Sequence, residues 1–389
     1  MNHSEAARQT ALRALSREIT HDLGKPLEPA WDKVFWTVPR ERFLPDLIHQ
    51  GPDLTPIDRS TDPERWFWAA YGDEPAITQL NGGDEPGAGE VRWASSSVPA
   101  PSVAFRMLDM LDVRDGHQVL EIGTGTGWNA ALLAQRVGAE NVTSVEVDPL
   151  LAVRAAEKLR ENGQDVEVIF GDGAVGHPRN APYRRVVATC SVRRVPYAWI
   201  EQTKPGGIVL TPWSSPWFDY GLLRLTVDGH GLASGWFAPD AVCAPLAQQR
   251  SYGMDLRNLV RQEGAAERSF TRLSPWAVTG DEWSARFAVG LQARDVRHVW
   301  DEDGPALRLW LATTDATSWA AVDDNGGGEG RYAVRQFGVR RLWDEVVAAY
   351  HWWRGAGEPG PGRFGLTVHP GGGHVPWLDT PDRPVPVTG

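Results

Sequence analysis

The chain has 389 residues, 42% of them hydrophobic, and carries a formal net charge of −11 with a sequence pI near 5.4. This length suits two domains or one domain with large additions, and the acidic balance argues against a duplex nucleic-acid partner, which requires a basic face. No run approaches the ~18 apolar residues of a membrane span. The polar N-terminus and the two cysteines, Cys190 and Cys243, predict a cytoplasmic protein without a signal peptide, a disulfide framework or a bound metal.

The first part of the chain has helical signals. Residues 5–20 combine helical spacing with good helix formers, and residues 31–36 continue an apolar helical face. That face ends at Val38, because the proline that follows biases it away from helix. We therefore expect an N-terminal helical segment over residues 1–80. The pattern further predicts loops at 50–63 and 81–89 and an amphipathic helix at 103–111.

Strand and helix signals alternate regularly from Gln118 to Trp213. Strands are predicted at 118–122, 142–146, 166–170, 185–189 and 207–211. Helices are predicted at 129–137, 149–162 and 195–203. This alternation predicts an α/β architecture, a doubly wound, Rossmann-like parallel sheet with helices on both faces.

The pattern changes beyond about residue 216. Strands are predicted at 222–227, 295–299 and 307–311, a helix at 341–353, and turns or linkers at 326–330 and 355–362. We expect a core over 81–250 and a C-terminal α+β accessory domain over 251–389, which would recognise the substrate. The nineteen tryptophans indicate mainly core packing, with an aromatic peptide-binding face as the second interpretation.

Three glycines at alternate positions follow the first predicted strand of the core. The stretch Val119-Leu-Glu-Ile-Gly-Thr-Gly-Thr-Gly127 reads as a strand, a tight turn and the start of a helix. Such glycines let a ligand approach the backbone, and the helix start offers free N–H groups. The expected cofactor loop comprises Glu121, Gly123, Thr124, Gly125 and Gly127.

Two further acids follow the next two strands. Glu146, followed by Val147, lies 19 residues beyond Gly127, close to the ~20 expected for an acid on a ribose hydroxyl. Asp172 and Gly173 follow the third strand, where the acid would meet an adenine amino group. The order of these three sites predicts a nucleoside-bearing cofactor.

The glycine spacing distinguishes between cofactors. A dinucleotide-binding loop places its third glycine differently, and an acid such as Glu121 just before the loop would repel a pyrophosphate. The same acid would tolerate a cationic sulfonium and its ammonium group. We therefore expect S-adenosylmethionine, with S-adenosylhomocysteine as the product.

The residues resemble the protein-L-isoaspartate O-methyltransferase family from about 31 to 213. Its marks are Val38-Pro-Arg-Glu-Arg-Phe-Leu-Pro45, Ala70-Tyr-Gly-Asp-Glu-Pro75, the glycine loop, Gly171-Asp-Gly173 with Ala181-Pro-Tyr183, and Gln202-Thr-Lys-Pro-Gly-Gly207. The resemblance implies a class I methyltransferase with a mostly parallel seven-stranded sheet whose last strand is antiparallel. It also implies a carboxylate acceptor on an aspartyl or isoaspartyl residue of a peptide or protein.

The chain departs from this family where the acceptor binds. The family's Gly-Gln-Thr-Ile-Ser string is absent, and Ser95, Ser96 and Ser97 stand in its place after the 81–89 insertion. We expect these serines to orient the acceptor carboxylate, with Ser97 the strongest candidate. A plain solvated turn is the alternative.

A second departure follows the fourth strand, in Ala188-Thr-Cys-Ser-Val-Arg-Arg-Val-Pro196. Arg193 and Arg194 stand near the carboxyl ends of the strands, where open α/β sheets bind ligands, and either could hold a peptide carboxylate. A solvated pair at a helix start is the alternative.

The third departure is the added C-terminal length. In this respect the chain is similar to actinobacterial homologues encoded beside ribosomally made, cyclised peptides (lanthipeptides and graspetides), which methylate an ordinary aspartate that then closes to an aspartimide. Repair of isoaspartyl residues, methylation of a small-molecule carboxylate and an inactive peptide-binding module remain the alternatives. The sequence does not specify the oligomeric state.

Because a carboxylate is already ionised at pH 7, positioning of the two reactants rather than a strong base would drive the methyl transfer.

Overall fold

The computed structural model describes residues 5–84, 92–218, 221–238, 266–301, 307–324 and 330–388. The expected linker at 326–330 falls mostly outside these residues, as do most of the 81–89 insertion, Cys243 and the boundary near 250. Within the described parts, no helix is long and apolar enough to cross a membrane.

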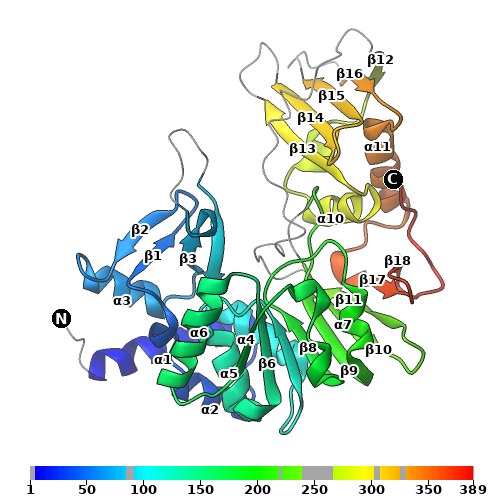
Figure 1. The fold of residues 1–389 in the computed structure, drawn as a ribbon. Helices are drawn as coiled ribbons and strands as arrows, with labels where there is room; N and C mark the ends of the chain where they lie inside the picture. Colours follow the sequence, from blue (N-terminus) through cyan, green and yellow to red (C-terminus); the bar gives the residue numbers. More distant parts are fainter. Residues whose placement is uncertain are drawn as a thin grey trace.

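A nine-stranded sheet forms the centre of the molecule, in the order β18-β17-β11-β10-β9-β8-β5-β6-β7 (Figure 1). Its parallel part consists of β5 (Val119–Ile122), β6 (Val142–Glu146), β7 (Glu167–Phe170), β8 (Tyr183–Ala188) and β9 (Thr203–Pro212). Four antiparallel pairings add β10 (Leu222–Val227), β11 (Ala233–Ala238), β17 (Phe364–Val368) and β18 (His374–Leu378). The five predicted parallel strands are confirmed. The expected total of seven strands is wrong, because β17 and β18 join from the far end of the chain.

Helices cover both faces of this sheet, as predicted. Alternate side chains of one strand enter different cores: Leu120 and Ile122 belong to one hydrophobic cluster and Val119 to the other. The surrounding helices are α4 (Pro101–Leu111), α5 (Trp128–Val137), α6 (Pro149–Glu161) and α7 (Tyr197–Glu201). The last of these is shorter than the predicted 195–203, since Pro196 precedes it and β9 begins at Thr203.

The N-terminal part contains a small sheet in addition to its helices. The helices are α1 (Glu5–Leu23), α2 (Pro29–Thr37) and α3 (Pro63–Tyr71). The antiparallel sheet, in the order β2-β1-β3-β4, consists of β1 (Leu47–Gln50), β2 (Thr55–Asp58), β3 (Ala76–Leu80) and β4 (Ala94–Val98). Residues 1–80 are therefore not wholly helical, and the loop predicted at 50–63 contains β2. These strands were missed because β1 and β2 have four residues each, too few to show an alternation.

The C-terminal part carries a five-stranded antiparallel sheet and helices, which fits the expected α+β extension. The sheet order is β12-β16-β15-β14-β13, with β12 (Glu267–Thr271), β13 (Val296–Asp301), β14 (Leu307–Thr313), β15 (Trp319–Asp324) and β16 (Tyr332–Phe337). The helices are α9 (Trp276–Thr279), α10 (Trp283–Gln292) and α11 (Leu342–Gly355). In Figure 1 this part rises above one end of the central sheet, while the N-terminal sheet rises above the other.

The C-terminal part shares its core with the central sheet. The ring of Phe287 in α10 lies 5.7 Å from that of Trp213 and 5.2 Å from that of Phe237, centroid to centroid. A Cβ on Gly290 would lie 2.6 Å from Ser215 Oγ, so only glycine lets α10 approach this closely. The domain division at residue 250 stays a prediction. The pairing of β11 with β17 and a continuous hydrophobic core both join residues from the two sides of this division.

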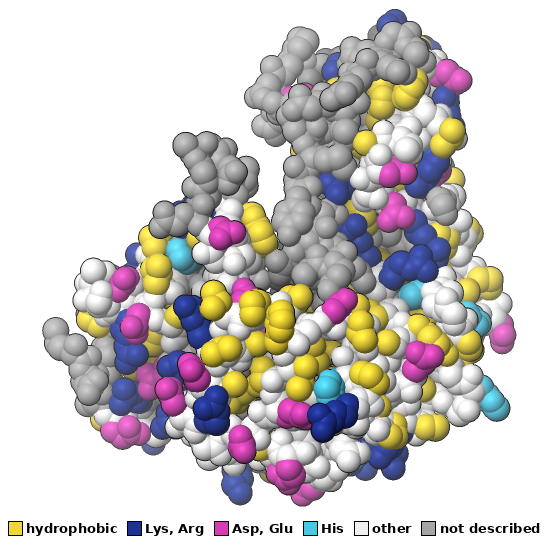
Figure 2. All heavy atoms as spheres, viewed as in Figure 1, with side chains coloured by type: hydrophobic (Ala, Val, Ile, Leu, Met, Phe, Trp, Pro, Cys, Tyr) yellow, Lys and Arg dark blue, Asp and Glu magenta, His cyan; other side chains and the backbone are white. Residues whose placement is uncertain are grey.

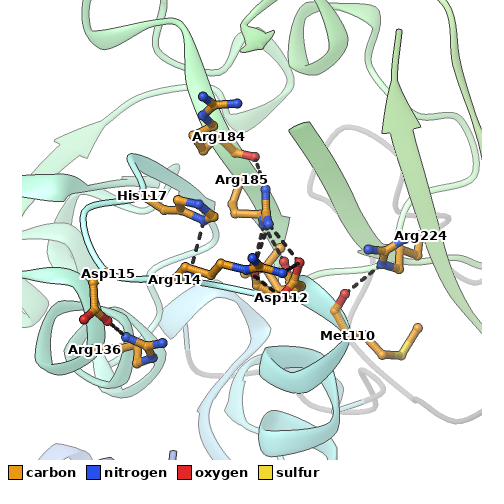
Figure 3. Close-up of polar contacts among 10 residues, drawn as sticks. Met110, Asp112, Arg114, Asp115, His117, Arg136, Arg184, Arg185 and Arg224 are labelled. Carbon is orange, nitrogen blue, oxygen red and sulfur yellow. Dashed lines mark hydrogen bonds and ion pairs between the residues drawn. The ribbon is translucent and has the colours of Figure 1, made fainter. Parts of the chain in front are cut away.

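Two arginines fix the C-terminal end of α4, which follows β4 directly (Figure 3). Arg185 Nε of β8 donates to Leu111 O at 2.6 Å and to Asp112 O at 3.0 Å, and Arg224 Nε of β10 donates to Met110 O at 2.8 Å. The last carbonyls of a helix lack intrahelical donors, and cations there also stabilise the helix dipole. These bonds tie α4, and with it β4, to the central sheet.

We predict that Arg185→Met lowers the free energy of unfolding by about 3 kcal/mol, because it leaves several buried carbonyls without a charged donor. Urea unfolding followed by circular dichroism measures this. The matched control is Arg184→Met, whose side chain is exposed on the same strand. Equal stabilities for the two variants would contradict the assigned role of Arg185.

Candidate active site

The glycine loop connects β5 to α5 and packs tightly against its neighbours. Gly123 has a φ of +92°, and a Cβ there would lie 2.6 Å from Thr189 Oγ1. Thr189 in turn donates to Gly123 O at 2.6 Å. Gly127 is the N-cap of α5, so the N–H groups of the first helical turn point towards the loop. No role was predicted from the sequence for Thr189, which stands at the end of the predicted strand 185–189; β8 ends one residue earlier, at Ala188.

Glu146 lies at this loop. Its Oε2 accepts from Gly125 N at 2.8 Å, and its Oε1 accepts from Val147 N at 2.9 Å. The carboxylate is therefore fixed by backbone donors at the edge of the sheet where β5 and β6 end. An acid held against a glycine loop suits the hydroxyls of a ribose.

Glu121 lies beneath the loop rather than on its surface. Its side chain is fully buried, and its carboxylate accepts from Ser144 Oγ at 2.5 Å and from Asn129 Nδ2 at 2.7 Å. Burial raises the pKa of Glu121 to about 7, although both hydrogen bonds oppose the shift. Thr124 Oγ1 and Ser144 Oγ are 2.6 Å apart, which links this network to the loop.

Asp172 and Gly173 follow β7 at the same edge of the sheet. Asp172 is exposed, and its Oδ1 accepts from Ala174 N at 2.8 Å, which makes it the cap of a short 3-10 helix. Gly171 N donates to Glu146 O at 2.9 Å, so this segment adjoins the Glu146 turn. Gly173 O accepts from Trp199 Nε1 at 2.7 Å. The position fits an adenine border, and Asp172 also caps this short helix.

The serine cluster lies on β4, and β4 reaches the glycine loop. Ser96 is buried, and its Oγ lies 3.6 Å from the Cβ position of Gly125. Thr78 Oγ1 of β3 donates to Ser96 Oγ at 3.1 Å. Ser97 pairs with Ile77 across the two strands. Ser96, rather than the favoured Ser97, is therefore the serine that the structure places beside the loop.

Ser95 is linked to the other side of the site through a residue that sequence reasoning missed. Its Oγ donates to Gln79 Oε1 at 2.7 Å, and Gln79 Nε2 donates to Asp148 Oδ2 at 2.8 Å. Asp148 caps α6, because its side chain accepts from Leu150 N and Leu151 N. This chain of contacts connects the serine strand to the turn that carries Glu146. An interrupted β3–β4 register and an insertion hid it from the sequence.

Arg193 and Arg194 lie elsewhere. They line a pocket with residues 213–216, which follow β9, and with residues from α10 and the β17–β18 hairpin. Its described lining residues include neither the serine cluster nor the glycine loop. The described residues also contain no group of three or more His, Cys, Asp or Glu suited to a metal ion.

The chemistry of the site follows from these groups. Backbone donors and a fixed carboxylate suit the ribose of a nucleoside cofactor, and a buried hydroxyl stands a few ångströms from the loop that would carry it. These groups can position two reactants but include no paired nucleophile and base.

Residues 54–218 match the family described as protein-L-isoaspartate(D-aspartate) O-methyltransferase. The protein-L-isoaspartate O-methyltransferase of Methanosarcina mazei is 31% identical over 217 residues, which cover 55% of this chain and 75% of that protein. The Ignicoccus hospitalis enzyme of the same name is 41% identical over 121 residues, or 31% of this chain. The match spans only 57% of the length of that relative.

A solved structure of a protein-L-isoaspartate O-methyltransferase shares the fold. It aligns with 96% of this chain and 100% of its own length, with a TM-score of 0.55 and 20% identity. The alignment covers most of the C-terminal part as well as the central sheet.

We predict that Glu121 makes the stability of the protein pH-dependent. Its pKa in the folded protein, about 7, exceeds the ~4.3 of an unfolded chain, so the folded state holds the proton more tightly. Its contribution therefore favours folding below about pH 4.3 and is lost as the pH rises to about 7. The free energy of unfolding of the wild type, relative to Glu121→Gln, should fall across this window and stay level above it.

Urea unfolding at several pH values measures this difference, with the exposed Glu157→Gln on α6 as control. If the free energies of unfolding of the wild type and Glu121→Gln change in parallel with pH, the pKa of Glu121 is not raised in the folded protein.

Proposed function

The chain belongs to the protein-L-isoaspartate O-methyltransferase family, and we propose that it methylates the side-chain carboxylate of an aspartyl residue in a ribosomally made, modified peptide. The methyl donor of this family is S-adenosylmethionine. The observation that carries the proposal is the position of Ser96 on β4, beside Gly125 of the loop that Glu146 contacts. A hydroxyl donor thereby lies beside the candidate cofactor loop.

The described residues fit the cofactor. The glycine loop, the start of α5 and Glu146 would hold its nucleoside, with Val147 adjacent and Asp172 and Gly173 at the next strand end. When bound, S-adenosylmethionine would supply the methyl group and leave as S-adenosylhomocysteine.

The protein's own task is to position the acceptor. A carboxylate is ionised at pH 7, so no base has to remove a proton. Ser96 Oγ–H would donate to one carboxylate oxygen and direct the other towards the methyl carbon. Proximity and orientation of this kind supply much of the acceleration of a displacement reaction. In the methylated peptide, the next backbone nitrogen can attack the ester carbonyl, release methanol and close an aspartimide.

Two features support a modified peptide as the substrate. The serine strand differs from the family's acceptor string, and the sheet end nearest the C-terminal part carries the arginine pocket. The alternative is repair of isoaspartyl residues, which the names of the relatives favour. The tight contacts at the glycine loop count against the third candidate, an inactive binding module.

The discriminating experiment is mass spectrometry of peptides incubated with the protein and S-adenosylmethionine. We expect cyclised aspartyl peptides to gain one methyl group or, once the ester has released methanol, to weigh one water less than the unmodified peptide. Methylation of isoaspartyl peptides alone would establish repair instead. Cofactor binding is measured by isothermal titration calorimetry with S-adenosylhomocysteine. If no binding is detected, the inactive peptide-binding module is the remaining hypothesis.

We predict that Ser96→Ala lowers kcat about tenfold or more, because it removes a hydrogen bond to a charged acceptor. The dissociation constant of S-adenosylhomocysteine should stay within about twofold. Ser97→Ala, on the neighbouring position of β4, is the matched control and should retain turnover. If Ser97→Ala lowers kcat and Ser96→Ala does not, Ser97 is the serine that orients the acceptor. Glu146→Ala should instead weaken cofactor binding.

A further inference from the structure

The pocket that contains Arg193 and Arg194 lies where the central sheet meets the C-terminal part. It encloses ≈ 590 Å³ of space, part of it open to solvent. Four segments distant in sequence line it: the residues after β8, those after β9, the end of α10 with Arg294, and the β17–β18 hairpin with His374. Figure 2 shows basic side chains and a histidine gathered at this junction.

The charged residues among the described lining residues are mostly basic, although the chain as a whole is acidic. They include three arginines and one acid, Asp295, whereas the whole chain carries a net charge of −11. Burial lowers the pKa of Arg294, and the nearby positive charge of Arg194 lowers it further, although Asp295 opposes this. Two guanidinium groups are thus held close together at the pocket wall.

Hydrogen bonds to backbone groups hold these side chains in place. Arg194 donates to Gly372 O at 3.1 Å, and Arg294 donates to His374 O at 2.9 Å. Val195 N donates to His374 Nε2 at 3.0 Å, so the ring must carry its proton on Nδ1, which lies 2.8 Å from Gly372 O. Burial lowers the pKa of His374 to about 4, which keeps the ring neutral in this role at pH 7. The arginines are therefore positioned before any ligand arrives, which reduces the entropic cost of binding.

The pocket and the glycine loop share one edge of the sheet. The loop follows β5 and the pocket follows β8 and β9, with β8 between β5 and β9. Neighbouring strands lie ~4.8 Å apart, so the two sites are about 10 Å apart along this edge. An extended peptide advances ~3.3 Å per residue and would cover that distance in about three residues.

From this geometry we propose that Arg193, Arg194 and Arg294 form a second subsite, which binds a carboxylate of the peptide substrate about three residues from the methylated aspartate. The proposal rests on the function proposed above. A guanidinium group binds carboxylate through paired hydrogen bonds, which gives direction as well as affinity. The carboxylate is either an acidic side chain or the C-terminal carboxylate of the peptide. The subsite would set which aspartate of a peptide enters the site.

The test compares synthetic peptides that contain one acceptor aspartate. In one pair, glutamate or glutamine stands three residues before or after the acceptor; in the other, the C-terminus is a free carboxylate or an amide. With the wild type, we expect the carboxylate peptides to have about tenfold lower KM and, by calorimetry, about tenfold lower Kd. The pair that shows the difference identifies the source of the carboxylate.

Arg294→Met should reduce this preference to about twofold or less, whereas Arg294→Lys should retain part of it. Arg193→Met serves as a second variant in case Arg294→Met unfolds. The matched control is Arg354→Met on α11, which is exposed and is not one of the lining residues. A preference of the wild type that survives both Met variants would overturn the proposal.

Binding and turnover separate the two proposals. If the peptides bind with the expected preference but are not methylated, the subsite stands and the proposed activity fails. If they are methylated and bound equally with and without the added carboxylate, the subsite fails and the activity stands. If the wild type neither binds nor methylates any of them, both fail.

Discussion

The close approach of backbone to side chain at the glycine loop is the constraint on which the site depends. Thr189 from the end of β8 occupies the space that a Cβ of Gly123 would need, and Ser96 from the N-terminal sheet comes within contact distance of Gly125. The loop is therefore the meeting point of two sheets, and Glu146 adds a third contact through Gly125 N. Any displacement of β4 moves the Ser96 hydroxyl, the candidate donor to the acceptor carboxylate, relative to the cofactor loop. This explains why the α4 end is tied so firmly to the sheet by Arg185 and Arg224.

A second constraint is the shared core of the central sheet and the C-terminal part. Phe287 packs against rings from β11 and from the residue after β9, and Gly290 removes the side chain that would keep α10 away. Because α10 is seated this closely, its end brings Arg294 to the carboxyl edge of the sheet. The C-terminal part thus forms one wall of the pocket that contains Arg193 and Arg194.

The sequence predicted the features that depend on local patterns. The five parallel strands, α1, α2, α4, α5, α6 and α11 and the position of Glu146 followed from periodicity, turn residues and spacing. It failed where partners are distant: β17 and β18 extend the sheet through pairing with β11, some 130 residues earlier. Glu121 was expected to be part of the cofactor loop, and the sequence did not indicate that its buried carboxylate accepts hydrogen bonds from Ser144 and Asn129. The irregular register between β3 and β4 determines whether Ser96 or Ser97 faces the glycine loop, and this register cannot be read from the sequence of either strand alone. His374 and Arg294 carried no motif that would connect them to Arg194.

The late position of β17 in the chain has a consequence for biosynthesis. β11 is complete at Ala238, but the strand that pairs with it begins at Phe364, so the ribosome must add more than a hundred residues before the pairing can form. Until then, β11 presents an unpaired edge, the kind of surface on which strands from other nascent chains assemble. We expect the growing chain to depend on chaperone protection during this interval.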